Sequence, residues 1–469
     1  MDFGASSIRV CVVDLDQRPV RTTVVHRYEH QPTRRSDGSL RWEWATLVAE
    51  AKRGIDLALA MGPAASIGID TWGLDYGLLD AGGRLVADPF SYRDSRLTTW
   101  ESTADRLGRR RLYDVTGTQL MAGNSVFQLA AHDRSELDRT AHVMMLPELL
   151  IHELCGVVTA EVTSAGTTAL VDRSTGRWSD DIVDDIGADR AWFADIMPAG
   201  VRVGTWRNTP VHLIGGHDTA CAVLAMAPAP SPGAVFVSGG TLFLIGREHP
   251  TAVINDSTFT RNISNEPGAF GGVRLLVNQQ GTWLLDQCRR HWGAPSVAAL
   301  LADVSPEHNP GVLFDTGDPS LVAPSNMPAA IAALTGLPAD TPPPVVCASI
   351  VRSMATAVAA AVKDLTTIDG TDVNPTGTGP TSTGPTSTGQ PDADRVDSDR
   401  TDSDRADQVV FFGGASGSDV LAESIAMATG LPVVRGSQEA TAVGNALAQG
   451  IALGQFTDVA HARSALAAR

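Results

Sequence analysis

The sequence predicts an α/β protein made of two related domains with a ligand-binding cleft between them. Three observations lead to this fold class. The chain has 469 residues, which is too long for one ordinary hydrophobic core. Strand-like and helix-like segments alternate through its first half. Each half also opens with the same pattern, in which a strand, an acidic residue and a glycine-rich turn occur together.

The composition is that of a globular protein without a surface for polyanions. Hydrophobic residues make up 43% and charged residues 19% of the chain, which is enough apolar material for packed cores. The net charge of −17 argues against nucleic-acid or anionic-membrane binding, because both need a basic surface. It does not exclude a nucleotide, because backbone N–H groups in loops and helix starts can hold phosphates.

The cysteines and the apolar segments predict a cytoplasmic protein that does not enter a membrane. The five cysteines are scattered and form no CxxC pair, so we expect reduced thiols rather than a disulfide framework or a zinc site. The first residues lack the basic and apolar regions of a signal peptide. No uninterrupted apolar run reaches the roughly 18 residues that a membrane span needs.

The first half begins with a strand pair and then alternates between helix and strand. Residues 8–14 and 18–28 are predicted to form antiparallel strands joined by a polar turn. Residues 44–60 carry apolar side chains at helical spacing, and residues 66–70 follow as a buried strand. We therefore expect a mainly parallel sheet with antiparallel edges.

The pattern starts again near Pro210. Residues 211–216 form an apolar strand, residues 217–227 a small-residue helix, and residues 234–246 a strand pair with glycines at its bend. This restart predicts a domain boundary that leaves residues 1–208 in the first domain and 209–469 in the second.

Residues 375–408 differ in composition from the rest of the chain. They hold the repeats GPTSTGPTSTG and DSDRTDSDRAD, which cannot build a core. We expect a disordered, low-complexity insert within the second domain. It is predicted to end where the strand VVFFGG begins.

The first motif that could carry chemistry is the segment from Asp2 to Ser7. A glycine and two hydroxyls after an aspartate can form a tight turn whose N–H groups hold phosphates, while the carboxylate holds Mg²⁺. An ordinary hairpin turn has the same pattern, so this motif alone leaves both interpretations open.

The second motif is GGHDTA, residues 215–220. Asp218 follows a buried strand and starts a predicted helix, where it could act as a general base at the carboxyl end of a strand. Plain N-capping of the helix is the alternative. His217 alone is typical of a structural hydrogen-bonding residue.

Two further glycine turns complete the set. Residues 238–241 form a second hairpin bend with a hydroxyl, suited to the β- and γ-phosphates, and residues 413–416 lie between a strand and a helix. Glycines in the last turn would let an adenine or a ribose approach the backbone. Each turn is ambiguous alone, but four in this order indicate a nucleotide held between two domains.

The complete set of motifs resembles the FGGY family of carbohydrate kinases in order and spacing over almost the whole chain outside the insert. The motifs are DFGASS, GIDTWGLDYGLLD, YRDSR, GGHDTACAV, SGGTLFLIG, NISNEPGAFGGVRLLVNQQGTWLLDQCRRHW, GGASGSDVL and EATAVGNAL. The combination of NEPG with RLLVNQQGTWLL is most similar to the branch that phosphorylates L-rhamnulose on its C1 hydroxyl. The resemblance implies two actin-like (ribonuclease H-like) domains that close over ATP and a sugar.

The resemblance also implies roles for single residues. Asp218 would be the catalytic base, and Asp2 would hold Mg²⁺. The residues implied to contact ATP are Ala5, Ser6, Ser7, Ile8, Arg9, Thr241, Asn278, Asp286 and Gly414. The residues implied to contact the sugar are Gly73, Asp75, Asn124 and His217. The partners implied are ATP and a small sugar, with no nucleic acid or membrane, and the protein would be a monomer or a homodimer.

The chain departs from the family pattern at several positions. Most of the strand that normally precedes Asp2 is missing, and Leu242, Gly239, Ser418 and Asp286 stand where the family usually carries other residues. Two alternatives therefore stay open. The chain could act on another ketose or polyol, such as fuculose or xylulose, or it could be a degenerate, non-catalytic nucleotide-binding regulator.

Overall fold

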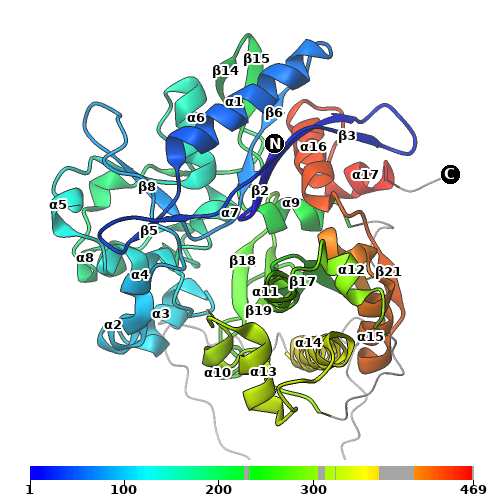
Figure 1. Cartoon of the computed structure of the whole chain (residues 1–469). Coiled ribbons are helices and arrows are strands. Elements are labelled where there is room, and N and C mark those ends of the chain that lie inside the picture. The colour runs from blue at the N-terminus through cyan, green and yellow to red at the C-terminus, as the bar shows by residue number, and fades with distance from the viewer. Residues whose placement is uncertain (227–230, 232, 305–311, 323, 369–405, 467–469) are drawn as a thin grey trace, which may run out of the picture.

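The computed structural model describes residues 1–226, 231, 233–304, 312–322, 324–368 and 406–466. Figure 1 shows a half coloured blue to cyan beside a half coloured green to red, each with its own sheet and covering helices. Most of the predicted insert, residues 375–405, lies outside the described residues.

The first half has a four-stranded sheet in the order β3-β2-β1-β7. Its strands are β1 (Asp2–Phe3), β2 (Ser7–Asp14), β3 (Arg21–Glu29) and β7 (Asp70–Thr71). The predicted antiparallel pair is confirmed, because β2 pairs with β3 along its whole length. β1 lies between β2 and β7, and it runs antiparallel to β2 and parallel to β7.

The predicted strand at residues 66–70 is two short strands. β6 (Ile67–Gly68) pairs in parallel with β15 (Thr209–His212), whereas β7 pairs with β1. The chain changes partner at Ile69, so one apolar run contributes to two sheets. β14 (Arg202–Trp206) forms a hairpin with β15, and the predicted boundary between residues 208 and 209 falls in the turn of this hairpin. By its pairing with β6, β15 belongs with the strands of the first half.

The second half has a six-stranded sheet in the order β18-β19-β17-β16-β20-β21. The strands are β16 (Ala234–Gly239), β17 (Leu242–His249), β18 (Ser264–Pro267), β19 (Val273–Gln280), β20 (Gln408–Phe412) and β21 (Val433–Arg435). β16, β17 and β19 form an antiparallel meander, and β20 lies parallel to β16. This repeats the arrangement of β1, β2, β3 and β7, so the two halves share one topology.

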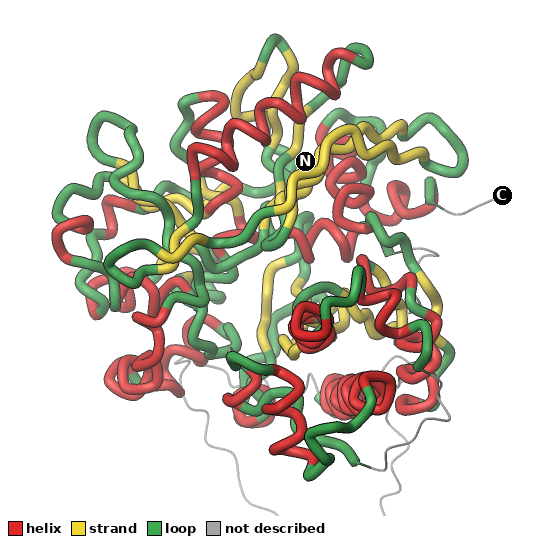
Figure 2. The backbone as a smooth tube through the Cα atoms, in the orientation of Figure 1, coloured by secondary structure: helices red, strands yellow, loops and turns green. Residues whose placement is uncertain are grey.

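The expectation of a mainly parallel sheet in the first half is wrong. In the four-stranded sheet two of the three ladders are antiparallel, and the ladder between β1 and β7 is parallel. In the second sheet three of the ladders are antiparallel and two are parallel. The reason is local, because each half begins with strands joined by short hairpin turns, and a short turn can join only antiparallel neighbours. Figure 2 shows these strands in yellow with helices around both sheets.

The helices bury one face against the sheets. The predicted helix 44–60 is confirmed as α1 (Trp44–Ala60), which packs on β2 and β3 through Trp44, Leu47, Val48, Ala51 and Ile55. The other helices of the first half are α2 (Trp100–Leu107), α3 (Arg109–Thr116), α4 (Ser125–Ala130), α5 (Arg134–Leu137), α6 (Leu146–Cys155), α7 (Val162–Ala165) and α8 (Asp180–Asp185). Those that follow are α9 (Asp218–Leu224), α10 (Asp256–Thr260), α11 (Trp283–Trp292), α12 (Val297–Leu301), α13 (Met327–Thr335), α14 (Pro343–Thr366), α15 (Asp419–Thr429), α16 (Ala440–Ala452) and α17 (Val459–Ser464).

α14 is the central helix of the second half. Its length and hydropathy would suffice to cross a membrane, but 67% of its most apolar window is buried inside the fold. It contacts α15 and the strands β17 and β19, and it is seen end-on in Figure 1. Core packing therefore accounts for its apolar sequence.

The two halves meet at the helix pair α9 and α16. Asn445 of α16 donates its side-chain amide to Asp70, 2.5 Å away, and to the carbonyl oxygens of Met1 and Gly68. One side chain of the second half thus contacts β6, β7 and the residue that precedes β1. This junction fixes how α9, which begins at Asp218, faces the first sheet.

Candidate active site

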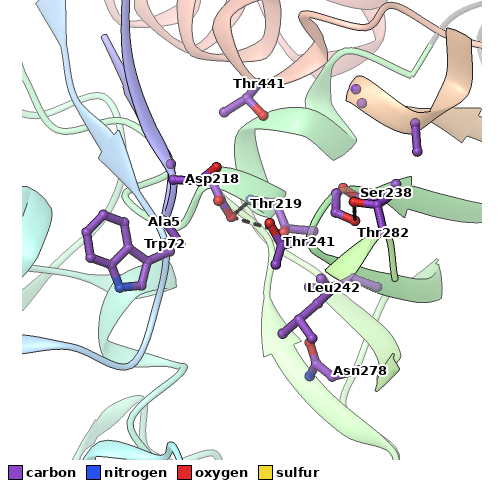
Figure 3. Close-up of a pocket in the computed structure, with 18 of the residues that line it drawn as sticks. Ala5, Trp72, Asp218, Thr219, Ser238, Thr241, Leu242, Asn278, Thr282 and Thr441 are labelled. Carbon is purple, nitrogen blue, oxygen red and sulfur yellow. Dashed lines mark hydrogen bonds between the residues drawn. The ribbon is translucent and has the colours of Figure 1, made fainter. Parts of the chain in front are cut away.

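A cavity of about 880 Å³ lies between the two halves and is lined by residues of both. Figure 3 shows Ala5 and Trp72 on one side of it and Ser238, Thr241 and Asn278 on the other. Twelve of the residues implied by the family motifs line this cavity. They are Asp2, Ala5, Ser6, Ser7, Arg9, Gly73, Asn124, His217, Asp218, Thr241, Asn278 and Gly414.

Asp218 is the first residue of α9, and its side chain reaches the cavity. The N-cap of this helix is His217, so the structure does not show the plain N-capping that the sequence left open for Asp218. Asp218 Oδ1 accepts hydrogen bonds from Thr219 N at 2.6 Å and Thr219 Oγ1 at 3.1 Å (Figure 3). These bonds fix the orientation of a carboxylate that stays accessible from the cavity.

The loop before Asp218 is held by a buried carboxylate of the first half. Glu161 Oε2 accepts from Gly216 N at 3.0 Å and from Thr163 N at 2.8 Å. Thr163 Oγ1 in turn accepts from His217 N at 3.1 Å. The base-bearing loop therefore depends on side chains that lie more than fifty residues away in sequence.

Asp2 lies in the cavity wall within an ionic cluster. Its carboxylate pairs with Arg9, whose Nη1 is also 2.6 Å from Glu439 Oε2. Burial raises the pKa of Asp2 to about 6; the charge of Asp218 adds to this rise and Arg9 opposes it. Asp2 and Asp218 therefore both line the cavity, close enough for the charge of Asp218 to act on Asp2.

The two glycine hairpins occupy equivalent places in the two sheets. Gly4 N donates to Ser7 O at 3.0 Å between β1 and β2, and Gly240 N donates to Leu242 O at 3.1 Å between β16 and β17. Both turns line the cavity. Their equivalence explains why the same motif occurs once in each half of the sequence.

Gly239, one of the departures from the family pattern, has a packing reason. A Cβ at this position would lie 2.5 Å from Phe411 Cε2 and 2.9 Å from Ala415 Cβ. A serine would displace the ring of Phe411, which is fully buried. Glycine at this position is therefore matched to its neighbours.

Gly73 lies in a strained turn at the cavity wall. Asp75 N donates to Gly73 O at 3.0 Å, and Leu74 between them has φ of +81°, which is the rare form of γ-turn for an L-residue. Leu74 N also donates to Thr167 Oγ1 at 3.1 Å. Thr167 and Gly73 both face the cavity.

Three of the implied site residues are not among the described residues that line the cavity. Ile8 is fully buried in the core of the first half. Asp286 lies on α11 and pairs with Arg289 at 2.7 Å and Arg290 at 2.8 Å. Asp75 is fully buried, and it accepts hydrogen bonds instead of facing a ligand.

The carboxylate of Asp75 organises the wall behind the cavity. Its Oδ2 accepts from Trp42 Nε1 at 2.7 Å and Trp72 Nε1 at 3.0 Å, and its Oδ1 accepts from Gln128 Nε2 at 3.0 Å. Burial raises the pKa of Asp75 to about 6, although these hydrogen bonds oppose the rise. Because Trp72 lines the cavity, Asp75 acts on its shape through this indole.

We expect Asp75→Ala to lower the free energy of unfolding by about 3 kcal/mol, because two buried indole N–H groups lose their acceptor. Chemical denaturation of the purified variant measures this loss. Asp195→Ala is the matched control, since the Asp195 side chain is 96% exposed, and it should change stability by less than about 0.5 kcal/mol. Equal stability of the two variants would contradict the assignment.

Sequence reasoning missed residues that join the two halves at the cavity. Gln119 Oε1 accepts from Asn278 N at 2.9 Å and Asn278 Nδ2 at 3.0 Å, and both residues line the cavity. Glu266, Thr282 and Thr441 line it as well. Glu266 belongs to the NEPG segment, which was visible as a motif but carried no assigned role.

Comparison with known proteins agrees with this geometry. The N-terminal domain of the FGGY family of carbohydrate kinases matches residues 1–225, and the C-terminal domain of that family matches residues 234–453. A rhamnulokinase of Enterobacter sp. (strain 638) is 30% identical over 98% of this chain and 90% of its own length. A rhamnulokinase of Bacteroides thetaiotaomicron is 30% identical over 99% of this chain and 92% of its own.

Solved structures share the fold at low sequence identity. A ligand-bound xylulose kinase from Lactobacillus acidophilus has a TM-score of 0.75 at 14% identity, with 100% of this chain and 92% of that chain covered. Plasmodium falciparum glycerol kinase with ADP has a TM-score of 0.70 at 15% identity, with 99% and 91% covered. The two-domain α/β fold, the cavity between its halves and these matches agree: the chain belongs to the FGGY family of carbohydrate kinases.

Proposed function

We propose that this protein is a rhamnulokinase, which transfers the γ-phosphoryl group of ATP to the C1 hydroxyl of L-rhamnulose and yields L-rhamnulose 1-phosphate and ADP. The observation that carries the proposal is the carboxylate of Asp218, held at the cavity between two equivalent glycine hairpins. Similarity to rhamnulokinases over nearly the full chain supports the choice of sugar.

The residues around the cavity suit an ATP site on the side of the second half. Turn N–H groups near Ser7 and Thr241 can donate to phosphate oxygens. A Cβ on Gly414 would meet nothing within 4 Å, so this backbone borders open space where a flat base or ribose can approach. Leu301 and Leu421 add apolar surface to the same region.

In the proposed reaction Asp218 accepts the proton of the C1 hydroxyl as that oxygen bonds to the γ-phosphorus. The bond from the γ-phosphorus to the β,γ-bridging oxygen breaks, and ADP leaves with that electron pair. A positioned carboxylate base contributes about 10²- to 10⁴-fold. Cavity residues from both halves hold the two reactants in line, which supplies much of the remaining rate enhancement.

The carboxylates in the cavity wall fit a magnesium ion that is bound mainly through ATP. Within the described ranges no three His, Cys, Asp or Glu side chains converge to form a metal site of their own. Mg²⁺ commonly keeps several waters and binds one or two carboxylates together with substrate phosphates. Asp2 would hold it here, next to Asp218, and the bound ion would offset charge on the phosphates.

The pKa of Asp2 makes this role testable by pH. Because burial raises that pKa to about 6, the carboxylate is charged at neutral pH and takes up a proton as the pH falls through 6. We expect the affinity for Mg·ADP to be constant above about pH 7 and to weaken at lower pH, because a neutral carboxyl binds Mg²⁺ poorly. Calorimetric titration across this range measures the change. Asp2→Asn should reduce this pH dependence to the part that the terminal phosphate of ADP contributes, because that phosphate also titrates at about pH 6. An unchanged profile in that variant would contradict the role of Asp2.

Product analysis tests the proposed reaction. Purified protein incubated with ATP, Mg²⁺ and L-rhamnulose should form a product whose phosphorus couples to the two C1 methylene protons in a ³¹P–¹H correlation spectrum. Coupling to a methine proton would place the phosphate elsewhere and overturn the regiochemistry. ATP binding without phosphate transfer to any sugar would favour the nucleotide-binding regulator instead.

A further inference from the structure

His217 lies between two carboxylates in the cavity wall. Its Nε2 is 3.4 Å from Asp218 Oδ1, and its Nδ1 is 3.1 Å from Glu266 Oε2. All three residues line the cavity, while the His217 side chain itself is only 9% exposed. The imidazole therefore joins the candidate base to a second acidic group that the family motifs leave without a role.

Glu266 is held from behind by a buried arginine. Glu266 on β18 and Arg274 on β19 are direct cross-strand partners, and Arg274 Nη2 is 3.1 Å from Glu266 Oε2. Burial alone would raise the pKa of Glu266, but hydrogen bonding to His217 and the charges of His217 and Arg274 outweigh it, so the net shift is downward. Glu266 is therefore ionised at neutral pH although it is buried.

Glu266 and Arg274 fix the orientation of the His217 ring from its Nδ1 side. Glu266 Oε2 is 3.1 Å from Nδ1, and Arg274 Nη2 is 3.4 Å from the same nitrogen. The opposite ring nitrogen, Nε2, is thereby directed toward Asp218, 3.4 Å away in the cavity wall.

We propose that Glu266, supported by Arg274, is a positioning residue that holds the His217 ring so that Nε2 hydrogen-bonds a sugar hydroxyl next to the one that Asp218 deprotonates. The ligand class is a polyhydroxylated substrate with a second hydroxyl close to its reacting one. This inference rests on the proposed function, because it concerns the same sugar site.

The arrangement has two consequences for the reaction. A sugar that offers a hydroxyl to Nε2 is oriented for attack, and a substrate that lacks it leaves a buried polar nitrogen unpaired. Without Glu266 the His217 ring can rotate, and Nε2 no longer has a fixed position beside Asp218. Glu266 thus affects both sugar binding and turnover while it acts through His217.

Steady-state kinetics of Glu266→Gln test the role. We expect kcat/KM for the sugar to fall by about tenfold or more, while KM for ATP stays within about twofold. The matched control is Glu248→Gln, because Glu248 on β17 is the cross-strand partner of Arg274 on its other side but is 41% exposed and outside the cavity. The control should retain wild-type kinetics. A Glu266→Gln enzyme with wild-type kcat/KM would overturn the proposal.

A double-mutant cycle separates positioning from direct sugar binding. If Glu266 acts through His217, adding Glu266→Gln to His217→Ala should change kcat/KM by less than about twofold. Full additivity of the two losses would show that Glu266 binds the sugar independently and would overturn the positioning role. The assay uses whichever sugar the wild type phosphorylates, so failure with L-rhamnulose alone would contradict the proposed substrate and not this inference.

The contact between His217 and the sugar can be observed in the wild type. In ¹⁵N-histidine-labelled protein the long-range ¹H–¹⁵N signals of His217, identified by their loss in His217→Ala, should shift when a saturating sugar is added. This measurement does not depend on whether Glu266→Gln folds. Signals of His217 that are unchanged by a sugar the enzyme phosphorylates would refute the proposal.

Discussion

Asp218→Asn should fold normally and lower kcat by about 10²-fold or more, because the amide keeps the shape of the carboxylate but cannot accept a proton. Its oxygen can still accept the hydrogen bonds from Thr219 that orient the side chain. Affinity for the nucleotide should change little. Steady-state kinetics and calorimetric binding of ADP measure the two quantities separately.

The control for this variant is Asp256→Asn. Asp256 is the first residue of α10, as Asp218 is of α9, but its side chain is 88% exposed and lies outside the cavity. This variant should keep wild-type turnover. A loss of turnover that occurs only in Asp218→Asn is then not a general effect of changing the first residue of a helix. An Asp218→Asn enzyme with more than half of wild-type kcat would contradict the assignment of the base.

Gly444→Ala should destabilise the protein by about 4 kcal/mol or more, or prevent it from folding. A Cβ at this position would lie 1.7 Å from the carbonyl oxygen of Cys221 and 2.6 Å from its carbonyl carbon. Both are backbone atoms of α9, so no side-chain rotation can relieve the overlap. α9 and α16 would have to move apart, and Asp218 would move with α9.

Thermal and chemical denaturation measure this effect, with Gly414→Ala as a matched substitution. A Cβ on Gly414 meets nothing within 4 Å, so this control should change stability by less than about 1 kcal/mol. If Gly444→Ala had the wild-type unfolding midpoint, the close packing of α9 against α16 would be contradicted.

Local sequence patterns predicted the elements that depend on local physics. Helix 44–60 matched α1 because its buried face repeats at helical spacing, and β2 and β3 matched because a polar turn separates two apolar runs. The break at Ile69 was not predictable in this way. It arises because β6 pairs with a strand from residues 209–212, whereas β7 pairs with β1.

The same contrast applies to the site. Asp2, Asp218 and Gly414 were found through motifs, and they line one cavity. The roles of Glu161 and Glu266 depend on contacts with the loop at residues 216–217, and no spacing in the sequence records such contacts. The motif that contains Asp75 predicted a contact with the sugar. The hydrogen bonds that Asp75 accepts from the indoles of Trp42 and Trp72 can be seen only in the structure.

The repeated topology explains why four ambiguous motifs were informative together. The hairpins β1–β2 and β16–β17 both have their turns at the cavity. β7 and β20 each lie parallel to the first strand of their half. A turn that occurs once fits many folds. The same turn at the same topological position in two facing domains favours a shared nucleotide.

The most direct test of the proposed function is kcat/KM measured with purified protein across a panel of ketoses and glycerol. L-rhamnulose, or a close 6-deoxyketose, should exceed glycerol by at least about 100-fold, because glycerol has fewer hydroxyls and leaves polar groups of the site unpaired. Fuculose and xylulose in the same panel identify a kinase of the family with a different sugar. Comparable kcat/KM for glycerol and L-rhamnulose would contradict the proposal that this site is built for L-rhamnulose.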